Sequence, residues 1–311
     1  MKRNQGKYVI GVDGGGTKTI VALADLGGNI LDKAEYGPSN PRKVGTEVAV
    51  VNIASGIRQV LKSRDKKILS TFIGLAAVQE EGQLKKEIKA ELFKQKGISP
   101  IFKGKVEIDS DQIVAFRSGT DEKIGIVLIS GTGCVAHGWH NGEEAKTSGW
   151  GHLTDEGSAF WIGQRGIQAV FKDLDGRGSK TLITKLAFKK WKVGEVENLM
   201  REVYSEDLIK IVPVFSILVD MAAKKRDKVA KDILTEAGVE LALAAKAVIK
   251  KLNFQKKKFP LVLVGSVFEA KVFLNIVKKE IKKIAPKAQF IQPKQEPVIG
   301  AVKLALEGLE E

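Results

Sequence analysis

The sequence predicts an α/β protein made of two lobes of similar design, and three observations support this. Apolar strand segments alternate with amphipathic helical segments, a rhythm typical of sheets covered by helices. A strand, a glycine turn and a returning strand occur twice, at 8–24 and at 124–139. The 311 residues suffice for two domains of ordinary size. We therefore expect one glycine turn in each lobe.

The first glycine turn combines backbone freedom with phosphate-binding chemistry. Tyr8–Val12 and Ile20–Leu23 are rich in β-branched residues and predict a hairpin. Gly14–Gly16 lack Cβ atoms, so an anion can approach their N–H groups, and Thr17–Thr19 add two hydroxyls and a cation. With the Asp13 carboxylate at its entrance, the turn suits a phosphate chain that carries magnesium. A glycine-rich β-turn without a ligand is the alternative.

Two commoner phosphate loops do not fit this turn. In a Walker A loop a lysine directly follows the last glycine, whereas Thr17 separates Gly16 from Lys18. That loop and the dinucleotide fingerprint also open a helix, whereas the residues after Lys18 have strand composition. The second turn, Ser130–Gly133, lies between an apolar run and a returning strand in the same way. The two glycine turns together therefore predict two phosphate loops for one nucleotide.

Two further stretches carry candidate substrate chemistry. A short strand from residue 106 ends in Asp109 and Asp111, and each of these is either a helix cap or a general base. The glycine-rich stretch 148–161 contains two tryptophans, a histidine and two adjacent carboxylates. Aromatic faces and carboxylates suit sugars, which predicts a polyol pocket. The alternative is that Asp155 and Ser158 cap the following helix, and His152 is expected to be a buried histidine rather than a metal ligand.

The rest of the chain supplies packing elements and two more loops. Helices are predicted at 45–61, 81–95, 112–118, 182–191, 212–221, 229–249, 270–284 and 298–309, and strands at 29–36, 68–76 and 259–264. The loop 37–41, with a proline at each side of Ser39 and Asn40, is either a capping turn or a neutral polar contact. Gly265 and Ser266 follow the last strand, a natural place for an adenosine or a phosphate.

The amino-acid composition excludes several kinds of protein. The chain carries 51 Lys and Arg against 37 Asp and Glu, a net charge of +14, but the basic residues come in scattered pairs and triplets that indicate solvated surface rather than a nucleic-acid site. The one cysteine, Cys134, excludes an intrachain disulfide and indicates a reducing compartment. No apolar run approaches the roughly 20 residues of a membrane span. We expect a cytoplasmic protein without a membrane partner.

Together these motifs resemble the sugar kinase, Hsp70 and actin superfamily of ATPases, and within it the N-acetylglucosamine kinase branch grouped with the BadF/BadG/BcrA/BcrD-type ATPases. The likeness covers the chain in order, at 11–19, 37–41, Asp111, 130–134, 149–161, 261–268 and 297–305. It implies two ribonuclease H-like lobes, the actin-like ATPase fold, with an active-site cleft between them. The implied boundaries are 1–117 for the N-terminal lobe, 118–296 for the C-terminal lobe, and 297–311 for a terminal helix that returns to the N-terminal lobe.

The resemblance also implies an ATP-dependent kinase acting on the 6-hydroxyl of a hexose or hexosamine, with N-acetylglucosamine as the expected acceptor. Asp111 would be the general base, and Asp13 would hold Mg²⁺. The ATP-binding residues would be Gly15, Thr17, Lys18, Thr132, Gly133, Ala223, Gly265 and Ser266, and the sugar-binding residues would be Asn40, Gly149, Trp150 and Asp155. Similar kinases are commonly dimers, so a homodimer is expected.

The sequence departs from the family pattern at three points, and two alternatives follow. One residue fewer separates Trp150 from Asp155, Cys134 replaces a serine, and Ala77 replaces a glycine. An activator ATPase of 2-hydroxyacyl-CoA dehydratases would share the fold, but it needs two cysteines from each subunit where this chain has one. A sugar-sensing ATPase without phosphoryl transfer is the second alternative, because the shortened loop alters the predicted sugar pocket.

Overall fold

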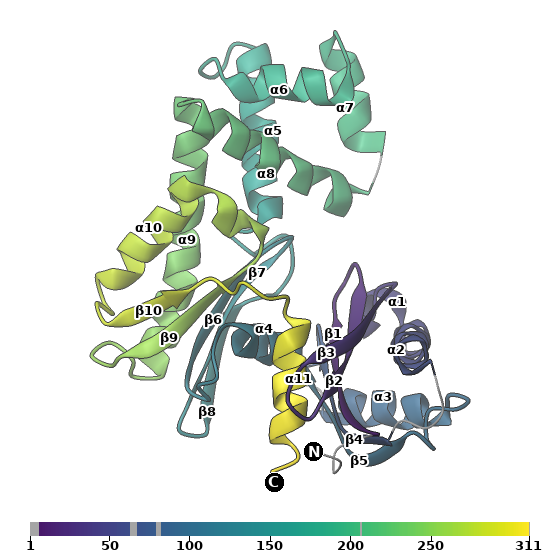
Figure 1. The fold of residues 1–311 in the computed structure, drawn as a ribbon. Coiled ribbons are helices and arrows are strands. Elements are labelled where there is room, and N and C mark those ends of the chain that lie inside the picture. Colours follow the sequence, from purple (N-terminus) through teal and green to yellow (C-terminus); the bar gives the residue numbers. More distant parts are fainter. Residues whose placement is uncertain (1–5, 63–66, 79–81, 206, 311) are drawn as a thin grey trace. The chain divides into compact units, whose positions relative to one another are not determined.

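The computed structural model describes residues 6–62, 67–78, 82–205 and 207–310, and the chain divides into two compact units (Figure 1). The first unit comprises residues 1–122 and 293–311, and the second comprises residues 123–292. Each unit is built on one five-stranded mixed sheet with helices packed against it. The predicted two-lobed α/β class is therefore confirmed.

The first unit contains the first glycine turn and both ends of the chain. Its strands are β1 (Lys7–Gly14), β2 (Thr19–Asp25), β3 (Ile30–Tyr36), β4 (Lys67–Leu75) and β5 (Phe102–Ser110). Its helices are α1 (Pro41–Val44), α2 (Thr46–Leu61), α3 (Gly82–Lys94), α4 (Asp111–Gly119) and α11 (Val298–Glu307). The strand order is β3-β2-β1-β4-β5, in which β1 to β3 form an antiparallel meander and β4 and β5 run parallel to β1. The predicted first residue of the third helix, Glu81, lies outside the described residues.

Strand β1 is buried on both faces because its side chains alternate between two apolar layers. Ile10 and Val12 belong to a cluster that includes α2, whereas Val9 belongs to a second cluster with α11. Helix α11 approaches β1 so closely that a Cβ atom at Gly11 would lie 2.6 Å from the backbone nitrogen of Val302. The strand therefore holds the first glycine turn on a rigid support.

The second unit repeats the sheet of the first. Its strands are β6 (Gly125–Ser130), β7 (Cys134–His140), β8 (Glu143–Ser148), β9 (Phe259–Val264) and β10 (Ala288–Ile291). Its helices are α5 (Ala159–Leu174), α6 (Leu182–Trp191), α7 (Val196–Ser205), α8 (Leu208–Lys224), α9 (Lys228–Lys251), the 3₁₀ helix η1 (Ser266–Glu269) and α10 (Lys271–Lys282). The order β10-β9-β6-β7-β8 again places an antiparallel meander beside two parallel strands. The second glycine turn occupies the same place between its strands as the first.

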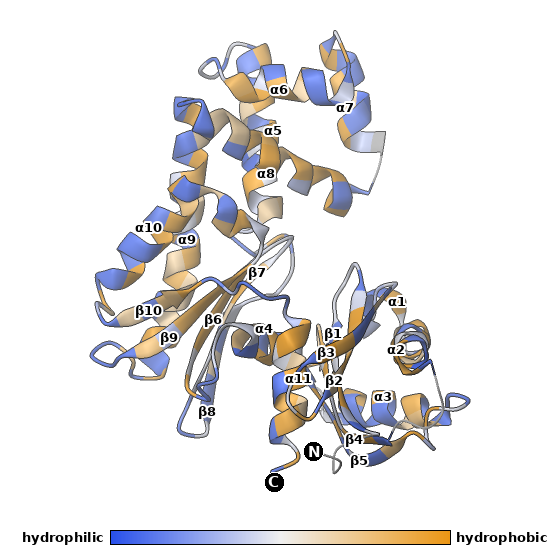
Figure 2. Ribbon diagram, viewed as in Figure 1, coloured by the Kyte–Doolittle hydropathy of each residue, from blue (hydrophilic) through white to orange (hydrophobic). Residues whose placement is uncertain are grey.

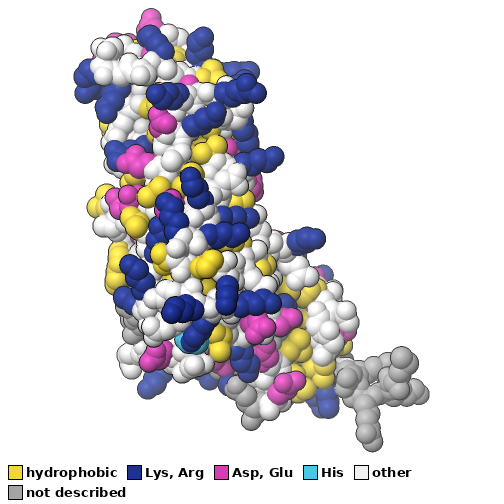
Figure 3. Space-filling model, turned by 90° about the vertical axis from the view of Figure 1, so that its left-hand side faces the viewer, with side chains coloured by type: hydrophobic (Ala, Val, Ile, Leu, Met, Phe, Trp, Pro, Cys, Tyr) yellow, Lys and Arg dark blue, Asp and Glu magenta, His cyan; other side chains and the backbone are white. Residues whose placement is uncertain are grey.

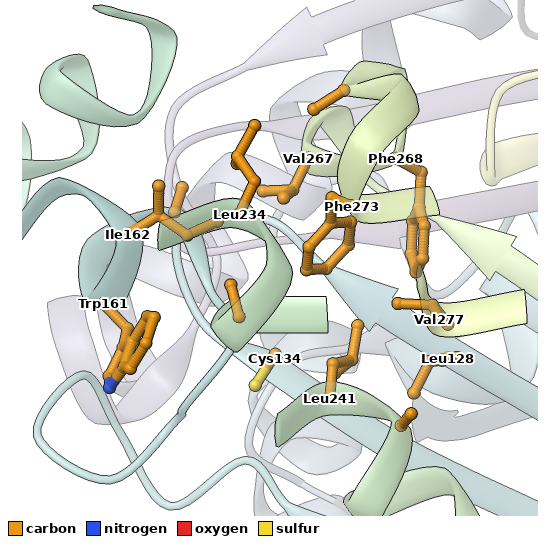
Figure 4. Close-up of a cluster of buried hydrophobic side chains, with 14 of the residues drawn as sticks. Leu128, Cys134, Trp161, Ile162, Leu234, Leu241, Val267, Phe268, Phe273 and Val277 are labelled. Atoms are coloured by element: carbon orange, nitrogen blue, oxygen red, sulfur yellow. The ribbon is translucent and has the colours of Figure 1, made fainter. Parts of the chain in front are cut away.

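A large apolar cluster holds the second unit together. Leu128 of β6 and Cys134 of β7 pack with Leu241 of α9 and Phe273 of α10 (Figure 4). Figure 2 shows the apolar character of β6 and β9, which lie at the centre of this sheet. Among the described residues, no helix combines the length and the apolar character that a membrane crossing requires.

Basic side chains do not gather into one patch on the face drawn in Figure 3. Lys and Arg side chains are scattered there among acidic, neutral and apolar ones. Several lysines of the described chain also pair with carboxylates, such as Lys246 with Glu280 at 2.9 Å and Lys303 with Asp121 at 2.7 Å. This distribution is that of solvated surface charge.

Candidate active site

The first glycine turn lies against the loop 37–41. The carbonyl oxygen of Gly15 accepts hydrogen bonds from the backbone N–H groups of Ser39 (3.0 Å) and Asn40 (3.2 Å). A Cβ atom at Gly14 would lie 2.3 Å from the Ser39 hydroxyl oxygen, so only glycine fits there. The buried Thr19 hydroxyl donates to the carbonyl of Gly37 at 2.7 Å. The turn and the loop 37–41 therefore form one ordered surface.

Three predicted binding residues lie on this surface. Thr17 and Lys18 are exposed at the tip of the turn, and the Lys18 ammonium pairs with Glu35 of β3 at 3.0 Å. This exposed pair is weak, because water screens it. The Asn40 side-chain oxygen accepts from the N–H of Arg42 at 3.0 Å and caps the short helix α1 rather than the predicted helix, α2, which begins after Gly45 without a side-chain cap. The amide NH₂ of Asn40 is not used in that contact.

The carboxylates of the first unit influence one another electrostatically. Burial and the negative charge of Asp111 raise the pKa of Asp13 to about 7, although Lys18 acts in the opposite direction. Glu296, just before α11, also raises this pKa, and its carboxylate pairs with Lys33. Glu296 could not be predicted from local sequence patterns, because only the return of the chain end brings it near Asp13.

Asp109 and Asp111 face different surroundings. The Asp109 carboxylate accepts from the Lys85 ammonium of α3 at 2.6 Å and from the Ser110 N–H at 2.7 Å. The cap of α4 is Ser110, whose hydroxyl accepts from the Gln112 N–H at 3.2 Å, so neither aspartate is the cap. Asp111 is the first residue of α4 and acts electrostatically on Asp13. Of the two, Asp111 is the one placed with the glycine turn.

The second glycine turn is fixed by the start of α5. The carbonyl oxygens of Gly131 and Thr132 accept from the N–H groups of Ala159 (2.8 Å) and Phe160 (3.3 Å). The hydroxyl of Ser130 donates to the carbonyl of Gly157 at 2.8 Å. The Thr132 side chain stays exposed. The carbonyls of this turn thus accept hydrogen bonds from the start of α5, and the exposed Thr132 hydroxyl can contact a ligand.

The predicted adenosine residues adjoin the second turn. Gly265, at the end of β9, has φ 116°, and a Cβ atom there would lie 2.1 Å from the Ser130 carbonyl oxygen. Ser266 begins η1 and is exposed. Ala223 lies near the end of α8 with its side chain in the apolar cluster, 4% exposed. The structure therefore brings Gly265 and Ser266 to the turn, and Ala223 could contribute only backbone atoms.

The loop after β8 presents one aromatic face and buries one carboxylate. Trp150 is 73% exposed, whereas Asp155 is 3% exposed. The Asp155 carboxylate accepts hydrogen bonds from backbone N–H groups of its own loop, including those of Gly149 and Trp150 at 3.0 Å each. Of the two predicted caps of this helix, Ser158 caps α5 through its hydroxyl, whereas Asp155, with its carboxylate directed at its own loop, is not the cap. His152 is partly buried, with its ring 4.7 Å from that of Phe160.

The donor set of the first unit fits Mg²⁺ carried by phosphate. Mg²⁺ is usually bound by one or two carboxylates together with waters and substrate phosphates. The negative charge of Asp111 opposes the ionisation of Asp13, and a cation would relieve this. Among the described residues no group of three or more His, Cys, Asp or Glu side chains could hold a metal. The fit is therefore to an ion that arrives with a nucleotide rather than to a protein cage.

Two sheets of the same topology, each with a glycine turn in its first hairpin, define the two-lobed actin-like fold. The chain belongs to the BadF/BadG/BcrA/BcrD ATPase family, whose model matches residues 10–305. Membership implies the use of ATP, in agreement with the sequence-based prediction.

Relatives and solved structures agree with this assignment. The chain is 32% identical over 310 residues to the N-acetylmuramic acid/N-acetylglucosamine kinase of Clostridium acetobutylicum, covering 96% of this chain and 98% of the relative. It is 31% identical over 317 residues to the N-acetyl-D-glucosamine kinase of Dictyostelium discoideum, covering 96% and 97%. A crystal structure of a candidate N-acetylglucosamine kinase from Chromobacterium violaceum superposes with a TM-score of 0.74 at 24% identity, covering 96% and 98%.

Proposed function

We propose that this protein is an ATP-dependent sugar kinase that phosphorylates the 6-hydroxyl of an N-acetylhexosamine, with N-acetylglucosamine as the first candidate. The relatives that match nearly the whole chain are kinases named for such sugars. The observation that carries the proposal is that Asp111 lies near enough to Asp13, beside the first glycine turn, for its charge to raise the pKa of Asp13. Both lie at the carboxyl ends of parallel strands, the usual ligand edge of an α/β sheet.

Asp111 is the proposed general base. The 6-hydroxyl oxygen attacks the γ-phosphorus, its proton passes to the Asp111 carboxylate, and the bond from the γ-phosphorus to the ADP oxygen breaks. When bound, Mg²⁺ would be held by Asp13 through water and would neutralise charge on the phosphates. The position of Asp111 supports this role, because it is the first residue of α4, directly after the carboxyl end of β5, and its charge acts on Asp13.

The glycine turns are the proposed phosphate sites, and each unit supplies one. Exposed hydroxyls and glycine N–H groups at both turns support this. Lys18 would exchange its exposed pair with Glu35 for a phosphate, at little energetic cost. The proposed nucleotide contacts are Gly15, Thr17 and Lys18 in the first unit, and Thr132, Gly133, Ala223, Gly265 and Ser266 in the second.

The proposed sugar contacts use neutral groups and one aromatic face. The amide NH₂ of Asn40 is a donor for a sugar oxygen, and Gly149 offers close backbone approach in its left-handed conformation, φ 79°. The exposed ring of Trp150 is a surface on which the apolar face of a sugar could pack. Asp155, predicted from the resemblance as a fourth contact, has its carboxylate directed at its own loop.

The test is ADP release from Mg-ATP with N-acetylglucosamine, N-acetylmuramic acid, glucosamine and glucose. We expect turnover on one or more N-acetylated sugars, and a loss of about 10²-fold or more in Asp111→Asn, the usual scale for a missing general base. Asp109→Asn is the matched control, because that carboxylate pairs with Lys85 and should be dispensable for turnover. ATP hydrolysis indifferent to every sugar would favour the sensing or activator class instead.

A further inference from the structure

The buried carboxylate of Asp155 accepts hydrogen bonds from two separate segments of the chain. One oxygen, Oδ1, accepts from the backbone N–H groups of Gly149 (3.0 Å), Trp150 (3.0 Å) and Gly151 (3.3 Å) and from the hydroxyl of Ser148 (3.3 Å). The other, Oδ2, accepts from the backbone N–H of Cys134 at 3.2 Å. One side chain therefore joins the loop 148–151 to the residue that ends the second glycine turn.

The backbone of the loop 148–151 is shaped around this carboxylate. Ser148, Gly149 and Gly151 all have positive φ, at 63°, 79° and 123°. Such a curl turns successive N–H groups toward one point and makes a concave anion site. For Ser148 this conformation is strained, and the surrounding contacts must hold it in place. The charge of Asp155 supplies those contacts, because hydrogen bonds to an ionised acceptor are stronger than neutral ones.

The second glycine turn is fitted to the same carboxylate. A Cβ atom at Gly133 would lie 2.7 Å from Oδ2 of Asp155, whereas a Cβ atom at Gly131 would meet nothing within 4 Å. The thiol of Cys134 donates to the carbonyl of Glu156 at 3.1 Å and lies 3.5 Å from the Ser148 hydroxyl oxygen. The turn and the loop thus share several contacts, with Asp155 at their centre.

We propose that Asp155 is a positioning residue that couples the second phosphate turn to the Trp150 loop, an inference that rests on the proposed kinase function for its consequences. Its carboxylate fixes the backbone of both segments and does not bind the sugar directly. The short connection between Trp150 and Asp155 fits this role, because the chain turns back at once, with the Asp155 N–H donating to the Gly151 carbonyl at 3.0 Å. A change at Asp155 therefore affects nucleotide and sugar together.

Cys134 can report on this coupling, because it is the one cysteine of the chain and a thiol reagent would label it alone. The thiol is 3% exposed, and burial raises its pKa to about 12, so it should react slowly with a thiol reagent such as DTNB. In Asp155→Asn the shape is retained, but one acceptor oxygen becomes an NH₂ group. That NH₂ would face the Cys134 N–H, so the contact between the two segments is lost.

The first experiment measures the DTNB labelling rate of Cys134 in the native protein. We expect Asp155→Asn to raise this rate about tenfold or more, the scale of a lost hydrogen bond to a charged acceptor. Asp173→Asn is the matched control, since Asp173 is equally buried, at 5%, but its carboxylate accepts from Thr184 (2.6 Å) and the Thr181 N–H (3.2 Å), outside both segments. That variant should label at the wild-type rate. If Asp155→Asn does not fold, Gly133→Ala replaces it, because its new methyl group displaces the same carboxylate.

The second experiment separates positioning from direct sugar binding. We expect Asp155→Asn to weaken the binding of a non-hydrolysable ATP analogue about tenfold in the absence of any sugar, besides raising KM for the sugar. A direct sugar ligand would raise the sugar KM and leave nucleotide affinity unchanged, and unchanged labelling of Cys134 would also overturn the proposal. If the wild-type protein binds no nucleotide, the kinase proposal fails, while the labelling result still decides whether Asp155 joins the two segments.

Discussion

Ala77 is an L-residue in a backbone conformation that favours glycine. It lies two residues after β4 with φ 68°, in the left-handed region where a Cβ atom crowds the carbonyl oxygen. The preceding residue anchors the chain there, because the Ala76 N–H donates to the Gly14 carbonyl at 3.0 Å. The family usually has a glycine at this position. This chain has an alanine there but keeps the left-handed backbone conformation.

Ala77→Gly should stabilise the protein. Removal of the Cβ atom relieves about 1 kcal/mol of strain, partly offset by the greater freedom of glycine in the unfolded chain. We expect the midpoint of thermal unfolding to rise by about 2 °C. Asn141→Gly is the matched control, since Asn141 also has positive φ, at 53°, but asparagine tolerates it and the gain should be smaller. A lower midpoint for Ala77→Gly would show that the methyl group contributes packing that outweighs the strain.

The choice between Asp109 and Asp111 shows why single site residues are hard to predict from sequence. Both lie at the end of the same predicted strand, and by sequence alone each could be a cap or a base. What distinguishes them is Lys85, which reaches Asp109 from α3, and the hydroxyl of Ser110, which takes the cap. Neither contact has a local signature in the sequence.

Among the elements, α11 is held to α4 by close packing and by an ion pair whose arginine is buried and whose glutamate side chain is 32% exposed. A Cβ atom at Gly300 would lie 2.0 Å from the Val114 carbonyl oxygen, so the two helices touch through backbone. The Arg117 guanidinium, 2% exposed, binds the Glu307 carboxylate through both terminal nitrogens, one of them at 2.8 Å. Helix α11 thereby closes the apolar layer over β1.

Glu307→Gln should destabilise the first unit, because Arg117 would stay buried without its counter-charge. Breaking one side of a fully buried pair typically costs about 3 kcal/mol, and we expect about 2 kcal/mol here because water reaches the Glu307 side chain, which is 32% exposed. The expected result is a lower urea midpoint for that unit, followed by the fluorescence of a tryptophan introduced there. Asp121→Asn is the control, because the side chain of Asp121 is 84% exposed where it meets Lys303, and its loss should cost less than about 1 kcal/mol. Equal effects of the two variants would contradict the idea that burial makes the Arg117 pair important.

The elements themselves were predictable, but their partners were not. Alternation and helical periodicity are local, so most strands and helices were expected near their observed positions, whereas the short elements β10 and α1 were not predicted. Arg117 and Glu307 are 190 residues apart in the chain, and nothing in either segment indicates the other. The same holds for Glu296, whose effect on Asp13 depends on the returning chain end.

At the scale of the whole molecule, one topology is used twice. The order of the strands along the chain, a meander followed by two parallel strands, is the same in both sheets. Two glycine turns in the sequence were enough to predict this repetition, because each lies in the first hairpin of its sheet. The homodimer expected from the resemblance stays a prediction.

The pH dependence of global stability should carry a contribution from His137. This side chain is 1% exposed on β7, with its ring 4.1 Å from that of Trp139, and its Nε2 lies 3.2 Å from the exposed carboxylate of Glu144. Burial, aided by the positive charge of Lys146, lowers its pKa from 6.5 to about 3. The folded protein thus keeps this histidine neutral at pH values where the unfolded chain protonates it.

Stability from His137 is therefore fully present above pH 6.5 and is lost as the pH falls toward 3. The loss should be about 1.4 kcal/mol for each pH unit in this window. The measurement is urea unfolding of the second unit between pH 7 and 4, for wild type and for His137→Gln. The carboxylates contribute equally to both proteins, so the difference in how the free energy of unfolding changes with pH comes from His137. His140→Gln keeps His137 and should retain the part of the slope that His137 contributes. Identical slopes in wild type and His137→Gln would mean that the core accommodates a charged imidazole, with Glu144 turning inward to meet it.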